Sequence, residues 1–191
     1  MAILITSFVD LYVKGVTDIN YHRPIFGYII SAIGFFYAVR IPYESIIRAA
    51  GHFKQTRNGA IFEASLNIIL SFILVIPFGM IGLAIGTLVA TIFRTIQYGI
   101  YTSKNIVDRS FWYIVKRYFI SFISIIITIL IFLIMPKITI NNFVDWIING
   151  LIITSVGFVV NIIFNIIFYK DDMLKMIKFI SRILKINIIK S

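Results

Sequence analysis

The sequence predicts an all-α integral membrane protein with five transmembrane helices, a short N-terminal helical segment and a C-terminal amphipathic helix. Of its 191 residues, 60% are hydrophobic and 14% are charged, whereas about a quarter of the residues in soluble domains are charged. Five apolar runs each approach the roughly 20 residues that a helix needs to cross a bilayer. The chain has no cysteine, which excludes disulfides, thiolate catalysis and cysteine-bound metals.

The expected organisation has three parts. Residues 1–23 form a partial helix and an outer loop, residues 24–169 form a five-helix transmembrane bundle, and residues 170–191 form a basic amphipathic tail. The expected spans are 24–49, 60–76, 79–100, 114–135 and 143–169. Each is long and apolar enough to cross the hydrocarbon core of a bilayer.

The apolar stretch at residues 2–9 is too short to cross a membrane. It has no positive charge ahead of it and no small-residue cleavage site, so it does not fit a signal peptide. A half-helix in lipid needs protein or the interface to satisfy its backbone groups. Because an odd number of spans follows this stretch, we expect it to be the outer end of a truncated helix. Our preferred explanation is therefore a fragment or a truncated reading frame, and a complete five-helix protein is the alternative.

Basic residues alternate between the two ends of the spans, and this alternation predicts the orientation. Fourteen of the eighteen lysines and arginines flank the first connection, the third connection or the C-terminus. Cytoplasmic segments are the ones enriched in basic residues. We therefore expect residues 51–58, residues 103–110 and the C-terminus to be cytoplasmic, in the cell's inner membrane. Because the net charge of +10 is explained by topology and anionic lipid, it does not indicate a nucleic-acid partner.

The first expected span contains Arg40, Glu44 and Arg48, which are unusual at or near membrane depth. Their spacing of four residues places all three on one helix face. Pro42 lies between them and predicts a kink, because proline removes an intrahelical hydrogen bond. These three charged residues are therefore candidates for a substrate contact or a gate.

Glu63 and Asn67 share a face of the second expected span. The connection before them is short, so we expect the first and second helices to pack antiparallel with Glu63 facing the charges of the first. One interpretation is an ion-pair clasp that neutralises costly charges and holds two helices together. The other is a proton or cation relay, or a contact for an anionic substrate.

The third expected span repeats small residues at Gly82, Gly86 and Ala90. Small residues at this spacing let helix backbones approach closely in lipid, so they predict helix packing rather than substrate binding. The polar residues at the cytoplasmic end of this span are Thr91, Arg94, Thr95 and Gln97. Among them, Arg94 is expected to snorkel toward the membrane surface.

The last two spans are almost entirely apolar, and Asn161 and Asn165 are their main polar interruption. We expect these asparagines to form hydrogen bonds between helices. In the tail, basic residues line one side of an apolar stripe, which predicts a helix lying on the inner leaflet. The basic residues expected at this membrane surface are Lys175, Lys178, Arg182 and Lys185.

Several segments resemble the C-terminal half of bacterial polysaccharide flippases. These belong to the multidrug/oligosaccharidyl-lipid/polysaccharide transporter superfamily. The similar segments are residues 18–21, 40–42 (Arg-Ile-Pro), 49–56 (Ala-Ala-Gly-His-Phe-Lys-Gln-Thr), 61–71 and 78–87. The detailed resemblance covers roughly residues 18–103, and hydropathy alone extends it to residue 169. Its specificity lies in the order of the polar positions.

The resemblance implies a transporter with two lobes around a central cavity, which moves a lipid-diphosphate-linked oligosaccharide outward by ion-coupled alternating access. This chain would supply most of the second lobe, and the missing N-terminal lobe or other polysaccharide-assembly proteins would be its partners. By the same resemblance, Arg40, Glu44, Arg48 and Glu63 are candidates for the cavity lining or its cytoplasmic gate. Arginine suits a diphosphate, because its guanidinium binds phosphate in a bidentate manner.

Two alternatives come from other functional classes. A membrane-embedded glycosyltransferase or polymerase would also be apolar and basic, but no expected outer loop is large enough for an active site with paired carboxylates. A structural subunit of polysaccharide assembly is the second alternative. No catalytic residue, cofactor or metal is expected, since His22 and His52 lie in different loops and neither has a second histidine at metal-ligand spacing.

Overall fold

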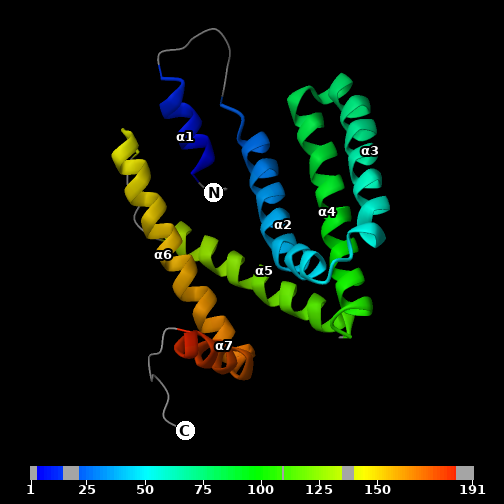
Figure 1. Cartoon of the computed structure of the whole chain (residues 1–191). Helices are drawn as coiled ribbons and strands as arrows, with labels where there is room; N and C mark the ends of the chain where they lie inside the picture. Colours follow the sequence, from blue (N-terminus) through cyan, green and yellow to red (C-terminus); the bar gives the residue numbers. More distant parts are fainter. Residues whose placement is uncertain (1–3, 15–21, 109, 135–139, 184–191) are drawn as a thin grey trace. The chain divides into compact units, whose positions relative to one another are not determined.

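The computed structural model describes residues 4–14, 22–108, 110–134 and 140–183. Seven helices run through this part of the chain, which contains no β-strand: α1 (Ile5–Tyr12), α2 (Pro24–Ala49), α3 (Phe53–Phe78), α4 (Met80–Asn105), α5 (Phe111–Ile134), α6 (Phe143–Phe168) and α7 (Lys170–Ile183). Five of them, α2 to α6, are long and apolar enough to cross a membrane (Figure 1). The predicted fold class is confirmed: this is an all-α, multi-pass integral membrane protein.

The first connection is shorter than the sequence predicts. Helix α2 ends through Gly51, which has a positive φ of 71°. The Gly51 N–H donates to the Arg48 carbonyl and the His52 N–H donates to the Ile47 carbonyl, the pair of bonds typical of a Schellman ending. Because α3 already begins at Phe53, the expected loop over residues 51–58 is wrong in extent. Hydropathy could not place this boundary, since the first turns of α3 are polar.

The second connection is a single residue. Gly79 has a φ of 56° and separates α3 from α4. The expected outer connection at Pro77 and Phe78 lies instead in the last turn of α3. α3 ends at Phe78, one residue after Pro77, and the positive φ of Gly79 lets the chain reverse direction at once.

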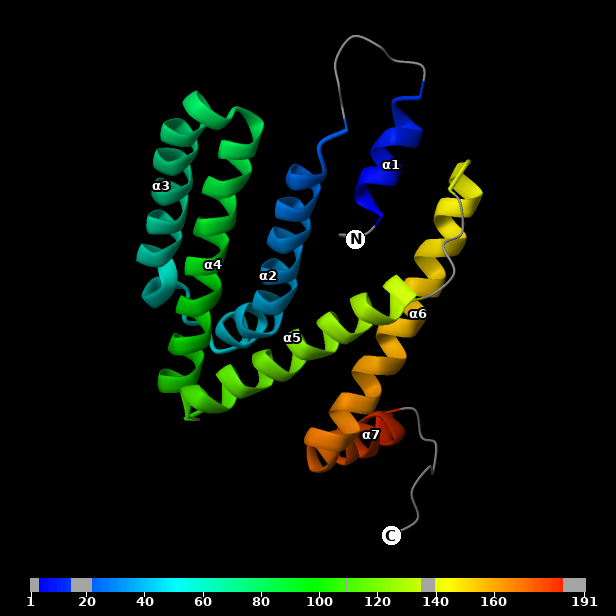
Figure 2. The same ribbon diagram turned by 180° about the vertical axis from the view of Figure 1, so that it is seen from behind.

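Helix α4 packs against both α2 and α3. Figures 1 and 2 show α4 between the other two from opposite sides. The expected packing of the first two spans against each other is therefore replaced by packing of both against α4, although Glu63 faces the α2 charges as expected. On the α3 side, a Cβ atom added at Gly82 would overlap the Leu74 carbonyl, and one at Gly86 would crowd Ser71. The small-residue face at Gly82, Gly86 and Ala90 is buried, as its spacing predicts.

Pro42 lies inside α2, which remains one helix from Pro24 to Ala49. Both ribbon views show the C-terminal part of α2 turning away from the direction of the rest. An internal proline removes one hydrogen bond and displaces the carbonyl four residues earlier. The turn therefore has a local cause, and it carries Glu44 and Arg48 on the part of α2 beyond the proline.

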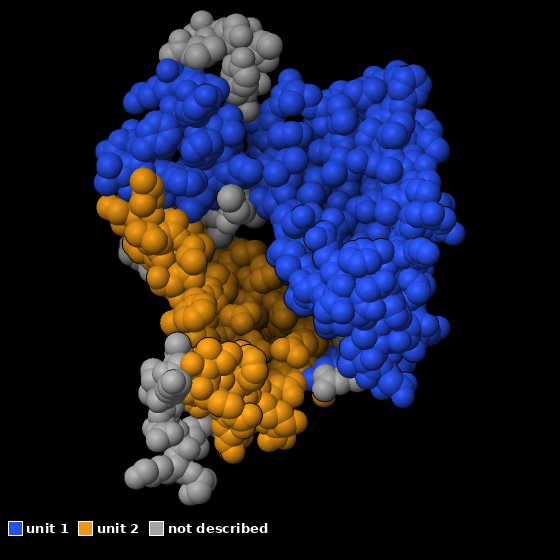
Figure 3. All heavy atoms as spheres, viewed as in Figure 1, with its two compact units in different colours: residues 1–114, 140–146 blue, residues 115–139, 147–191 orange. Residues whose placement is uncertain are grey.

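The chain divides into two compact units, coloured separately in Figure 3. The first contains residues 1–114 and 140–146, and the second contains residues 115–139 and 147–191. The first unit includes α1 to α4 and the beginning of α6. All of the charged residues discussed below as a site belong to this first unit.

The short helix α1 makes contacts with α2 and α6 within the first unit, although none of its residues is buried. The Trp146 indole N–H donates to the Leu4 carbonyl at 3.0 Å, and the Phe8 ring lies 5.1 Å from the Trp146 ring. Gly27 of α2 leaves room for the Ile5 side chain. These contacts cover α1 on one side only.

In the second unit, Arg117 connects the start of α5 to the start of α7. Its guanidinium lies 3.9 Å from the Asp172 carboxylate and 5.4 Å from the centre of the Tyr169 ring. Burial raises the pKa of the Tyr169 phenol, while the positive charge of Arg117 opposes that rise. Tyr169 lies just beyond α6 and stays a neutral phenol at physiological pH.

Helix α7 matches the predicted amphipathic tail over Lys170–Ile183. Lys175, Lys178 and Arg182 are exposed on it, whereas Lys185 lies outside the described residues. So do residues 18–21, one of the segments that carry the family resemblance. The sequence predicts that the two α6 asparagines form hydrogen bonds to other helices. Instead, the Asn165 amide donates within α6, to the side chain and to the backbone carbonyl of Asn161.

Candidate functional site

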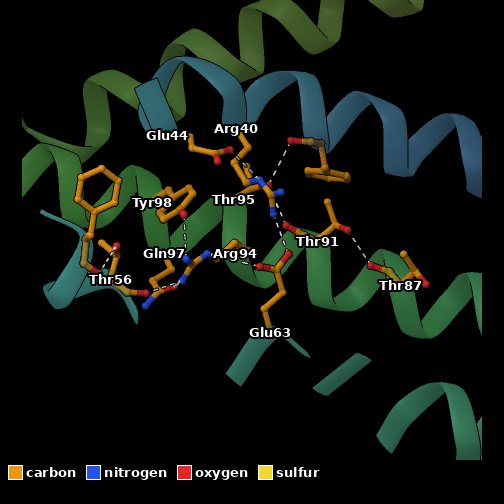
Figure 4. Close-up of polar contacts among 12 residues, drawn as sticks. Arg40, Glu44, Thr56, Glu63, Thr87, Thr91, Arg94, Thr95, Gln97 and Tyr98 are labelled. Atoms are coloured by element: carbon orange, nitrogen blue, oxygen red, sulfur yellow. Dashed lines mark hydrogen bonds and ion pairs between the residues drawn. The ribbon is translucent and has the colours of Figure 1, made fainter. Parts of the chain in front are cut away.

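Five charged side chains from α2, α3 and α4 meet in the first unit, and we refer to them as the charge cluster. The members of the charge cluster are Arg40, Glu44 and Arg48 on α2, Glu63 on α3, and Arg94 on α4. Figure 4 shows Arg40, Glu44, Glu63 and Arg94. Charges within membrane spans are costly unless they are paired or face water. The three helices therefore meet through charged side chains that neutralise one another.

Glu63 is the centre of the charge cluster. One carboxylate oxygen accepts a hydrogen bond of 2.7 Å from the Arg40 guanidinium, and the other lies 3.4 Å from Nε of Arg94. Because Arg40 belongs to α2 and Arg94 to α4, one carboxylate joins three helices. The sequence predicts the approach of Glu63 to the α2 charges, and the structure adds the second arginine.

Arg40, Glu44 and Arg48 form a row of ion pairs along one face of α2, as their spacing predicts. Glu44 lies between two arginines, with one oxygen 3.8 Å from Nε of Arg40 and the other hydrogen-bonded to Arg48. The two arginine side chains differ sharply in exposure, at 14% for Arg40 and 67% for Arg48. Arg40 therefore lies within the protein, while Arg48 reaches the surface. The Arg40 guanidinium also lies 4.8 Å from the centre of the Tyr37 ring.

Arg94 does not snorkel, and that expectation is wrong. Its side chain is 5% exposed and donates hydrogen bonds to the Thr56 carbonyl at 3.1 Å, the Gln97 amide oxygen at 2.7 Å and the Tyr98 hydroxyl at 2.8 Å. Its guanidinium also lies over the Tyr98 ring at 4.1 Å. A planar, forked donor can meet several acceptors at once, so burying Arg94 leaves its charge satisfied.

Gln97 reaches the cluster because α3 has a glycine at the facing position. A Cβ atom added at Gly59 would overlap the Gln97 amide group. The absence of a side chain at Gly59 lets the amide lie against the α3 backbone and accept from Arg94. This contact explains a glycine in the middle of a helix, where the residue otherwise costs about 1 kcal/mol relative to alanine.

A pattern in α4 could have revealed the burial of Arg94. Thr87, Thr91 and Thr95 recur every fourth residue, and the hydroxyls of Thr91 and Thr95 donate to the carbonyl four residues earlier. Thr95 also donates to the Phe36 carbonyl of α2 at 3.2 Å. A polar stripe with helical spacing on an apolar span indicates a face turned toward protein. Arg94 borders this stripe.

Asn67 belongs to a separate contact between α3 and α4. Its side-chain oxygen accepts hydrogen bonds from the Ser71 hydroxyl at 3.0 Å and the Thr87 hydroxyl at 3.2 Å. The predicted common face of Glu63 and Asn67 is present, because both side chains meet α4. The structure therefore places Asn67 in helix packing rather than within the charge cluster.

The charge cluster is open at one edge. A pocket of about 380 Å³ is lined by Glu44 and Arg48 of α2, the beginning of α3, and Arg94 of α4. Three arginines face two glutamates in the cluster, so one positive charge remains. The site therefore combines partly buried ion pairs with an accessible, positively charged edge.

Each histidine contacts a polar side chain from another part of the chain. His22 lies 3.0 Å from both carboxylate oxygens of Asp10, and His52 lies 2.9 Å from the Tyr101 hydroxyl. Across the part of the chain that the structure describes, no three metal-ligating side chains lie together. Comparisons with protein-family models, with curated proteins and with solved structures found no match to this chain.

Proposed function

We propose that this protein is part of a transporter that flips a lipid-linked oligosaccharide repeat across the cytoplasmic membrane, for the synthesis and export of a cell-surface polysaccharide such as O-antigen or capsule. The substrate class comes from the resemblance of the polar segments to polysaccharide flippases. In such a two-lobe transporter the chain would supply most of one lobe. Its partners would be membrane lipid, the diphosphate-linked oligosaccharide and the opposing lobe, or other polysaccharide-assembly proteins.

The single observation that carries this proposal is the charge cluster at the meeting point of three membrane helices, with a pocket at its edge. Charged groups inside membrane spans are typical of ion and substrate pathways. A purely structural clasp does not need an accessible edge. The pocket therefore favours a gate or a substrate contact.

Glu63 is suited to a gate because it holds two arginines on two helices. Loss of its charge, by protonation or by movement of α3, would release Arg40 and weaken the hold on Arg94. A released guanidinium can bind a diphosphate in a bidentate manner. In this mechanism, Arg40 alternates between Glu63 and the substrate, and the Glu44 carboxylate, 3.8 Å from Nε of Arg40, attracts it without a hydrogen bond.

Arg94 supports the alternative of a structural role for part of the cluster. All three of its guanidinium nitrogens contact groups of the protein itself. We therefore assign Arg94 to positioning Glu63 and leave substrate contact to Arg40, Glu44 and Arg48. The structural-subunit alternative predicts that neutralising any member of the cluster changes only assembly and abundance.

The decisive variant is Glu63→Gln, which removes the charge and keeps the size of the side chain. In the source cell, the variant chain should reach normal abundance in the membrane, while lipid-linked oligosaccharide accumulates on the inner leaflet and surface polysaccharide falls. Asp171→Asn is the matched control, because it removes a carboxylate at the start of α7 outside the cluster. Normal surface polysaccharide in Glu63→Gln would refute the proposal, and a loss of abundance alone would favour the structural alternative.

A further inference from the structure

The pocket beside the charge cluster contains positive charge that the cluster does not use. Lys54 and Arg57 line it from the first two turns of α3, and both are exposed. Throughout the described part of the chain, no carboxylate lies within ion-pair distance of either side chain. We propose that this pocket binds the phosphate headgroup of an anionic membrane lipid.

The balance of charge in the pocket favours an anion. Arg48 lines the same pocket and contributes a third exposed positive charge, which Glu44 offsets. Arg94 is committed to Glu63 and its other partners. Lys54 and Arg57 therefore add two unpaired positive charges to the one that the charge cluster retains. The N-terminal end of α3 adds a smaller field of the same sign.

The remaining wall of the pocket favours a lipid over a free anion. Ile47, Phe53 and Ala60 provide an apolar lining beside the charges. From Phe53, the same face of α3 continues through Ile61 to Ile68, and both isoleucines are exposed. A headgroup bound at Lys54 and Arg57 could therefore lay an acyl chain along α3. The volume of about 380 Å³ is within the range of small-molecule sites.

The site lies where α2 ends and α3 begins, at one end of two membrane spans. Anionic lipid headgroups are found at this depth and attract basic side chains close to the membrane. The inference does not rest on transport, because lipid binding can be measured without any transported substrate. Both proposals use the same pocket, but the lipid test removes Lys54 and Arg57, whereas the transport test removes Glu63, so their failures are distinguishable.

Native mass spectrometry of the full chain in neutral detergent tests the site. Phosphatidylglycerol and phosphatidylcholine are the probes, and retained lipid is counted per protein. The wild type should hold one phosphatidylglycerol in preference to phosphatidylcholine. Lys54→Gln with Arg57→Gln should weaken that binding about tenfold. The matched control, Lys104→Gln with Lys116→Gln, removes two exposed charges outside both the pocket and α7 and should stay within roughly twofold of the wild type.

Three results would overturn the proposal. Equal weakening in the two double variants would indicate general attraction to basic surface. Equal retention of phosphatidylglycerol and phosphatidylcholine would show that the pocket does not select an anionic headgroup. Displacement of phosphatidylglycerol by an equal concentration of inorganic phosphate would assign the pocket to a free anion.

A second measurement uses the wild-type chain and does not depend on the variants folding. Phosphatidylglycerol with a photoreactive headgroup is crosslinked to the protein, and the labelled peptides are identified. Labelling within residues 44–60 is expected. Labelling confined to α7 would place the anionic lipid on the basic surface helix and refute the pocket.

Discussion

Arg48 and Arg94 have the same side chain and lie near the same end of the bundle, yet their surroundings differ completely. Arg48 is 67% exposed and pairs with Glu44 on its own helix, whereas Arg94 is 5% exposed and bonds to groups on α3 and α4. An exposed pair is screened by water and contributes little. A buried one leaves an uncompensated charge when it is broken.

Arg94→Gln should therefore destabilise the protein by roughly 3 kcal/mol, because Glu63 loses one partner and three hydrogen bonds disappear. Arg48→Gln is the matched comparison and should cost less than about 1 kcal/mol. Reversible unfolding in mixed micelles, followed by circular dichroism, measures both. Equal costs would show that Arg94 does not hold the helices together in solution as it does in the structure.

At the scale of elements, α4 is the helix around which the first unit is built. One face approaches α3 through glycines, and hydroxyls and Arg94 contact α2 and α3. Lipid tails are as apolar as leucine, so association in a membrane depends on close packing and hydrogen bonds rather than on hydrophobic burial. α4 supplies both of these.

The glycine face of α4 predicts a clear difference between positions. Gly82→Ala and Gly86→Ala should each destabilise the protein by about 1–3 kcal/mol, because the added methyl group meets the α3 backbone. Gly99→Ala is the control on the same helix. An added Cβ there has no neighbour within 4 Å, so helix propensity should make it neutral or stabilising. Thermal unfolding in one detergent compares the three, and similar melting temperatures would contradict the close α3–α4 contact.

At the scale of the whole molecule, five membrane helices place the segment before α2 and the segment after α6 on opposite sides. The basic residues predict that α7 is cytoplasmic. The chain has no natural cysteine, so a single introduced cysteine reports one position without background. Arg23 before α2 and Lys175 on α7 are both exposed.

Arg23→Cys should react with a membrane-impermeant maleimide in intact spheroplasts, whereas Lys175→Cys should react only after permeabilisation. Mass-tagged maleimide and gel mobility give the labelled fraction. Labelling of both positions from outside would show an even number of crossings. The reverse pattern would show the opposite orientation and would place the proposed lipid pocket at the outer leaflet.

The sequence alone determined the membrane class, the five spans and the common face of Arg40, Glu44 and Arg48, because hydropathy and helical periodicity are local properties. The amphipathic α7 is predictable for the same reason. Boundaries failed where polar residues continue a helix, as at the start of α3.

Only the tertiary structure decided which helices are neighbours. The placement of α4 between α2 and α3, the burial of Arg94 and the double role of Glu63 all depend on contacts between residues far apart in the chain. Local periodicity shows which face of a helix is polar. It does not show which helix meets that face, since in lipid several polar partners could satisfy the same charge.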